Sequence, residues 1–176
     1  MAKTKQNRRL VTLPVGRLSY PHLLEAYAFE EGDSKKFMTD FMFGYGDDPV
    51  PNLDGLKEAV KAVAKEAGYT AKNPVKPPPE GVESYKVRVT AKSDYRPKIH
   101  GANGSVIDPD TLTDDDVYPG RRAVGRVVVA PYAGFGGGVT LYLQGVKLLS
   151  EDGVRIGGSY DGSWASEDEP EDGEDF

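Results

Sequence analysis

The alternation of apolar and polar residues predicts β-strands along much of this chain. In KFMTDFMF, at residues 36–43, the three phenylalanines share one face and a lysine and an aspartate lie on the other, which predicts a half-buried strand. YKVRVTAK, at residues 85–92, alternates as regularly, and its basic residues share the outward face. A strand also begins over residues 13–18, and Pro21 is expected to end its regular pairing or to confine it to an edge.

Two more strands are predicted further along the chain. RRAVGRVVVAPY and GVTLYLQGVKLL, at residues 121–132 and 138–149, have the length and the β-branched content of strands. The glycine-rich stretch AGFGGG joins them. Because glycine adopts many backbone conformations, this joint is predicted to be a flexible hairpin loop.

One amphipathic helix is predicted over residues 53–67, where apolar residues recur at helical spacing. Asn52 or Asp54 can cap its start, and Gly68 stands just past its end. The three prolines at 77–79 then favour an extended connector. The element order of two strands, one helix and three strands predicts a mainly β fold, a small and partly closed barrel with one inserted helix.

Charge is segregated along the chain. The net charge is −6, yet seven of the last ten residues are Asp or Glu and none is basic. Without these seven, 21 acidic residues remain against 22 basic ones, so the body is close to neutral and its basic residues are clustered. A segment with that charge density and no apolar periodicity is predicted to stay disordered. We therefore expect a flexible basic N-terminus over 1–12, one folded domain over 13–160 and a disordered acidic tail over 161–176.

The residue types that catalysis or cofactor binding require are scarce. The absence of cysteine excludes disulfides and thiolate metal sites and fits an intracellular setting. His22 and His100 lie in no metal-ligand spacing, and AGFGGG precedes a strand instead of opening a helix, so we expect no metal and no nucleotide cofactor. No apolar run of membrane-span length follows the basic N-terminus.

Aromatic and basic residues are interleaved in SYPHLLEAYAF, SYKVRVTAKSDYRPK and VYPGRRAVGR, which indicates binding to single-stranded nucleic acid. Bases stack on aromatic faces while cations follow the phosphates. The other interpretation of any single residue is a tyrosine in the core or a lysine on a solvated face. The candidates for base stacking are Tyr20, Tyr27, Tyr95, Tyr118 and Tyr132. The candidates for phosphate contacts are Lys36, Lys86, Arg88, Lys92, Arg96, Arg121 and Arg122.

Several short motifs, taken in order, resemble a known family. They are SYPHLLEAYAFEEG, KKFMTDFMF, the amphipathic helix, KNP, TAKSDYRP, VYPGRRAVGRVVVAPY, LYLQGVKLLSEDGVRIGG and the acidic end in DF. Together, from about Val15 to Phe176, they resemble phage single-stranded-DNA-binding proteins, a family once known as a domain of unknown function. The resemblance implies an OB-fold, a five-stranded and partly closed barrel with one inserted helix. It also implies binding of single strands in phage replication or recombination, without catalysis.

The acidic tail is the candidate partner-binding site, and its last residues are Glu174, Asp175 and Phe176. Its carboxylates can compete with DNA for cations, and its terminal ring can insert into an apolar pocket on another protein. The expected partners are single-stranded DNA and replication or recombination proteins of the phage or its host, in the host cytoplasm. No membrane is expected to take part.

Two other functions stay open from the sequence. One is a phage structural protein of the capsid or tail, in which the aromatic residues form the core and the tail prevents aggregation. The other is a metal-dependent nuclease that uses the five aspartates between residues 108 and 116 to hold Mg²⁺. That stretch is rich in turn-forming residues, where aspartates are more often solvated.

Overall fold

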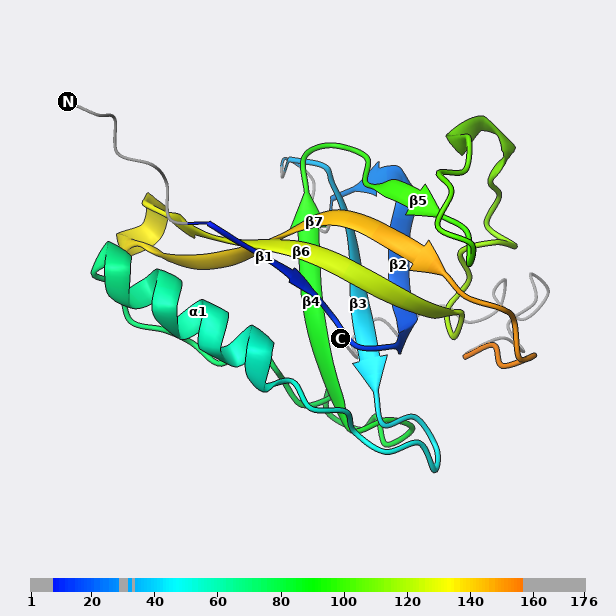
Figure 1. Cartoon of the computed structure of the whole chain (residues 1–176), viewed down its shortest axis with the longest axis horizontal. Helices are drawn as coiled ribbons and strands as arrows, with labels where there is room; N and C mark the ends of the chain where they lie inside the picture. The colour runs from blue at the N-terminus through cyan, green and yellow to red at the C-terminus, as the bar shows by residue number, and fades with distance from the viewer. Residues whose placement is uncertain (1–7, 29–31, 33, 157–176) are drawn as a thin grey trace.

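The structure, a computed structural model, describes residues 8–28, 32 and 34–156, and every structural statement below concerns these residues. Seven strands and one α-helix make up the fold (Figure 1). The strands are β1 (Arg9–Thr12), β2 (Gly16–Tyr27), β3 (Lys36–Phe43), β4 (Val87–Ser93), β5 (Lys98–His100), β6 (Arg122–Tyr132) and β7 (Gly138–Leu148). The helix α1 (Asp54–Ala67) lies between β3 and β4 in the sequence, and short 3₁₀ turns occupy Pro109–Thr111 and Gly134–Gly136.

The sheet closes into a five-stranded ring. Its strand order is β1-β6-β2-β3-β4-β7-β5, and a further pairing of β6 with β7 joins β2, β3, β4, β7 and β6 into a closed circuit. The seam between β4 and β7 rests on a single parallel residue pair, Lys92 with Tyr142, so closure there is only partial. The predicted fold is confirmed: it is mainly β, with a partly closed, OB-like ring of five strands and one inserted helix.

Apolar side chains from all sides of the ring meet in one core. Phe41, Val89, Val127 and Leu143 come from four different strands and are each at most 2% exposed. Gly125 in β6 makes room for the largest of them, because a Cβ built there would lie 2.3 Å from Phe41 Cζ. The alternation predicted for residues 85–92 is confirmed, with the apolar residues turned inward.

The helix ends as predicted, but its N-cap is Leu53, which makes no side-chain cap hydrogen bond, instead of Asn52 or Asp54. The Asn52 side chain accepts a hydrogen bond from the Asp54 backbone N–H at 2.7 Å, and Gly68 ends the helix in the left-handed conformation with φ 80°. Its apolar face, with Leu56, Val60 and Val63 buried, packs against β6, β1 and β7. In Figure 1 the helix therefore lies along the β6–β7 hairpin.

The strand expected over residues 13–18 continues further than predicted. Strand β2 passes through Pro21 and ends at Tyr27. Its pairing with β3 shifts register between Ser19 and His22, and Tyr20 takes a positive φ of 48° there. Pro21 lies inside this irregularity, where the ladder is interrupted, so its missing N–H breaks no regular pairing.

The prediction that β3 is half-buried is wrong, because both of its faces are covered. The outward-facing Met38, Asp40 and Met42 are all at most 7% exposed. Asp40 accepts a hydrogen bond from the Thr90 hydroxyl and pairs with Arg88, which places a polar network over the middle of the ring. The outer face of β3, which lies between β2 and β4, is thus covered in part by polar side chains. The alternation of the sequence alone did not predict this.

Two short strands were not predicted. Residues 9–12, expected to belong to a flexible N-terminus, form β1 and pair with β6. Residues 98–100 form β5, which pairs in parallel with β7. Both strands lie at the ends of the sheet, and β5 supplies two of the residues that matter below, Lys98 and His100.

Candidate nucleic-acid interface

A groove lined by basic side chains crosses the outer surface of β5, β7 and β6. Its volume is about 740 Å³, and no carboxylate lines it. We call it the basic groove. Its basic side chains are Arg96, Lys98, His100, Arg126 and Lys147, and Gln144 adds a neutral amide.

Strand register explains why these side chains face the same way. Residues paired across neighbouring strands project from the same face of a sheet. Lys98 is paired with Gly145, and Gly145 with Arg126, so one row carries a cation on each side of a glycine. The next row pairs His100 with Lys147.

The cations of this surface lack ion-pair partners within the described part of the chain. Lys98, Arg126 and Lys147 make no ion pair with any carboxylate there, and neither does Lys92 on β4. Arg96 donates a hydrogen bond to the Leu24 carbonyl at 2.9 Å and lies 5.8 Å from the Phe37 ring centroid. Both partners are neutral, so neither cancels the charge of Arg96. Like charges lining a concave surface raise the local positive potential, so the groove attracts anions.

Other cations proposed from the sequence are already neutralised. Lys36 Nζ lies 2.6 Å from Asp94 Oδ1, and Arg88 Nη1 lies 3.4 Å from Asp40 Oδ2. Arg88 also donates to the Pro77 carbonyl at 3.0 Å. Since a nearby opposite charge cancels most of the field of each partner, Lys36 and Arg88 offer little free charge to a phosphate.

Two of the proposed contacts are structural, which corrects the prediction for them. Tyr118 is 4% exposed and lies beneath the Arg155 guanidinium, 4.1 Å from its ring centroid, so no base can stack on it. Burial, followed by the charge of Glu151, raises the pKa of the Tyr118 hydroxyl. Arg121 donates to the Leu149 carbonyl at 2.7 Å and pairs with Glu151 at 3.1 Å, so it fastens the segment after β7.

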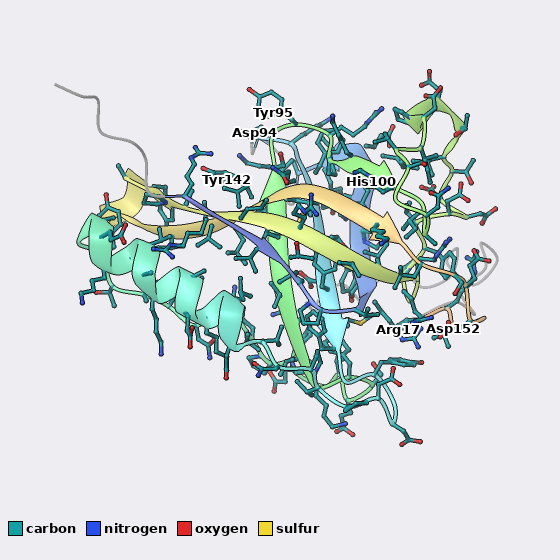
Figure 2. The ribbon with its side chains drawn as sticks, in the orientation of Figure 1. Arg17, Asp94, Tyr95, His100, Tyr142 and Asp152 are labelled. Atoms are coloured by element: carbon teal, nitrogen blue, oxygen red, sulfur yellow. The ribbon has the colours of Figure 1, made fainter. Side chains whose placement is uncertain are left out.

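Two tyrosines, the exposed Tyr95 and the half-buried Tyr142, lie near the cations of this surface. Tyr95, in the loop between β4 and β5, is 80% exposed. Tyr142 is paired with Lys92 across the seam of the ring, and the Arg8 guanidinium lies 5.9 Å from its ring centroid. In Figure 2, Tyr95, Tyr142 and His100 lie toward one side of the molecule, while Arg17 and Asp152 lie toward the other. Two tyrosines, one in the β4–β5 loop and one on β7, therefore lie near the cations of β4 and of the basic groove.

The remaining candidates lie outside the basic groove. Tyr20 is 52% exposed at the irregularity of β2, and Tyr27 is 40% exposed and stacks on His22 with a centroid distance of 4.2 Å. Tyr132, 38% exposed, lies at the end of β6. Lys86 is exposed just before β4, and Arg122 lines a separate groove with Arg17. Glu174, Asp175 and Phe176 lie outside the described residues.

Sequence reasoning missed most of the basic groove. It named Arg96 and left out Lys98, His100, Arg126, Gln144 and Lys147, and it also left out Tyr142, which lies outside the groove. One signal was available: Arg126 and Lys147 interrupt otherwise apolar strands, at positions where a purely buried strand would have an apolar side chain. The parallel pairing of β5 with β7, which brings these residues together, leaves no local mark in the sequence.

The aspartates between residues 108 and 116 serve the loop that holds them. Asp108 accepts a hydrogen bond from the Asp110 backbone N–H at 2.9 Å, and Asp116 accepts one from Thr113 at 2.8 Å. Asp115 pairs with Arg155 at 3.5 Å. Among the residues that the structure describes, no group of three His, Cys, Asp or Glu is placed to hold a metal ion. In the same part of the chain, no helix is both long and apolar enough to cross a membrane.

No family model matches the chain, and no curated protein sequence matches it. Solved structures do. A single-stranded DNA-binding protein from bacteriophage Enc34 superposes with a TM-score of 0.65 at 18% identity, over 94% of this chain and 97% of that one. The same protein in complex with ssDNA gives a TM-score of 0.63 at 17% identity, over 88% and 96%.

A second phage protein has the same architecture. The single-stranded DNA-binding protein gp2.5, encoded by bacteriophage T7, superposes with a TM-score of 0.61 at 13% identity, over 92% of this chain and 96% of that one. The agreement extends over nearly the whole of each chain, so it includes the ring and the inserted helix together. This chain therefore has the fold of the phage single-stranded DNA-binding proteins, as the resemblance of its sequence motifs predicted.

Proposed function

We propose that this protein binds single-stranded DNA during phage replication or recombination and is not an enzyme. The observation that supports this best is the basic groove, where Lys98, Arg126 and Lys147 lack carboxylate partners in the described part of the chain, with the 80% exposed Tyr95 next to Arg96 in the sequence. Proteins with this fold include one that has been seen in complex with ssDNA. A structural protein gives no reason for a groove of unpaired cations, whereas a nuclease would also need one, so the test below must separate binding from cleavage.

The chemistry of the surface favours single strands over duplex. A base can stack on Tyr95 or Tyr142 only where its own face is open, and in a duplex both faces are already stacked. The cations then follow the phosphates of the same strand. Arg and Lys contacts to phosphates do not depend on base identity, so binding is expected to be largely independent of sequence.

The contact residues follow from exposure and pairing. The stacking residues are Tyr95, Tyr142, Tyr132, Tyr27 and Tyr20, all of which keep part of the ring open. The phosphate-binding residues are Lys92, Arg96, Lys98, Arg126 and Lys147. Lys86 and Arg122, which lie outside the basic groove, are further candidates for phosphate contacts. Lys36 and Arg88 take part only where DNA opens their ion pairs.

The acidic tail extends the proposal to protein partners. Its carboxylates compete with DNA for the basic groove, and DNA binding then frees the tail for a replication or recombination protein in the host cytoplasm. On such a partner, Phe176 enters an apolar pocket while Glu174 and Asp175 meet a basic rim.

The test is a titration of a fluorescent oligonucleotide with the full chain, with and without Mg²⁺. We expect binding to weaken as salt rises and the oligonucleotide to stay intact. Duplex DNA should be a poor competitor. Lys98→Ala should weaken binding, whereas Lys61→Ala, which removes an exposed lysine of α1, should not. No binding would favour the structural protein, and cleavage that depends on Mg²⁺ would favour the nuclease.

A further inference from the structure

Gly145, which lines the basic groove, is a glycine whose backbone conformation other residues can also adopt. Its φ lies outside the left-handed region that favours glycine. A Cβ built there meets a single atom within 4 Å, the Lys98 carbonyl oxygen at 3.3 Å. By contrast, Cβ atoms at Gly125 and Gly137 would come within 2.3 Å and 2.2 Å of aromatic rings. No side chain would contact a Cβ at Gly145, so the missing side chain leaves this part of the groove unfilled, although the Lys98 carbonyl oxygen would have to shift by a few tenths of an ångström to admit one.

That space lies between two unpaired cations. Lys98 and Arg126 flank Gly145 in one row across three strands. Neighbouring strands are about 4.8 Å apart, so the two cations start roughly 10 Å from each other. Long side chains on both sides of a bare backbone leave a gap in which a phosphate can meet both charges at once.

The residue beside Gly145 is displaced from the regular ladder. Arg126 is paired with Gly145 and Val127 with Leu143, so Gln144 is the extra residue of a bulge in β7. A bulge re-aims a side chain, and Gln144 is exposed and lines the basic groove. Its amide can both donate and accept a hydrogen bond, so it can pair with an edge of any base.

We propose that the Gln144–Gly145 bulge is the central contact for the single strand. A phosphate lies over Gly145 between Lys98 and Arg126, and the Gln144 amide hydrogen-bonds an edge of the adjoining base. The strand continues past Lys92 and Tyr142, where the next base stacks. This assignment rests on the proposed function and deepens it, since it states where on the surface the strand runs.

The first test fills the space without changing the charge. Gly145→Val should weaken binding to a fluorescent dT oligonucleotide at least tenfold and lower the salt slope by about 0.7, the share of one phosphate. Gly55→Val is the control for adding the same side chain elsewhere, because Gly55 is exposed on α1 and a Cβ there would meet no atom within 4 Å. It should leave affinity and salt slope unchanged.

Two further variants at the surface keep the inference testable if Gly145→Val does not fold. The pair Lys98→Gln with Arg126→Gln should lower the salt slope by more than either change alone. Gln144→Leu, which keeps the size of the side chain, should weaken binding several-fold on dT, dC and dA oligonucleotides alike and leave the slope as it was. Circular dichroism and melting temperature check that each variant is folded.

The outcomes separate this inference from the function on which it rests. If the unmodified protein binds no single strand, the proposed function is wrong and the inference with it. If it binds, but the charge pair and Gln144→Leu leave affinity and slope unchanged, the strand runs elsewhere and only the inference is overturned. A folded Gly145→Val variant that binds normally would overturn it in the same way.

Discussion

At the scale of single residues, pairing decides which basic side chains are available to DNA. Lys36 and Lys92 lie on neighbouring strands, and both were predicted to contact phosphates. Lys36 is held by Asp94 at 2.6 Å, whereas Lys92 has no carboxylate partner in the described part of the chain. The sequence shows two lysines of equal standing, and only the contacts separate them.

The salt dependence of binding tests this difference. Lys92→Ala and Arg96→Ala should each weaken binding to all oligonucleotide sequences about equally and lower the salt slope by about 0.7. Lys36→Ala should leave the slope nearly unchanged, because its charge is already cancelled by Asp94. Titrations at four or more salt concentrations measure the slopes. A slope that falls for Lys36→Ala but not for Lys92→Ala would reverse the assignment.

Two tyrosines test exposure in the same way. Tyr95→Ala should reduce the binding free energy by ~1–3 kcal/mol and leave the melting temperature unchanged, because the ring is 80% exposed. Tyr118→Ala should lower the melting temperature and leave the affinity for DNA unchanged, because that ring is buried under Arg155 and its removal leaves a cavity. Thermal melts and DNA titrations of both variants decide the matter. Equal losses of affinity would show that exposure does not select the stacking residues.

At the scale of elements, the sequence predicted what alternation and capping determine. The helix, β4 and the β6–β7 hairpin each leave a periodic pattern of their own, and the structure contains them where they were expected. β1 and β5 have only four and three residues, too few for a pattern, and their places depend on pairing with distant strands. For the same reason most of the basic groove escaped prediction: its residues come from β5, β6 and β7, and only the pairing brings them together.

One ion pair joins two elements and predicts a response to acid. Arg17 on β2 holds Asp152, in the segment after β7, at 2.8 Å, and the hydrogen bond from Arg17 is the main cause that lowers the Asp152 pKa below its ordinary 3.8. A carboxyl group with a lowered pKa stabilises the folded state above its unfolded pKa and ceases to do so as pH falls through the folded value. The melting temperature of the unmodified protein should therefore fall further between about pH 5 and pH 3 than that of the Asp152→Asn variant. Parallel curves for the two would show that the pair is energetically unimportant.

At the scale of the whole molecule, charge is divided between a basic surface and an acidic end. The last ten residues hold seven carboxylates and no cation, while the basic groove is lined by no carboxylate. The tail lies outside the described residues, so its effect is a prediction from charge. Opposite charges on one chain attract most at low salt, and a nucleic acid competes with the tail for the same cations.

Deleting residues 166–176 and changing Phe176→Ala separate the two roles proposed for the tail. The deletion removes seven carboxylates and should tighten binding to single-stranded DNA, most at low salt where screening is weak.

Phe176→Ala leaves the charge as it is, so DNA affinity should stay the same. It should instead abolish capture of a replication or recombination protein, because a buried aromatic anchor typically contributes ~2 kcal/mol or more to such an interface. DNA titrations at low and high salt, beside pull-downs of replication proteins from infected cells, measure both effects. If the deletion weakens DNA binding, the tail does not compete with DNA, and if Phe176→Ala retains every partner, the tail does not recruit through its last ring.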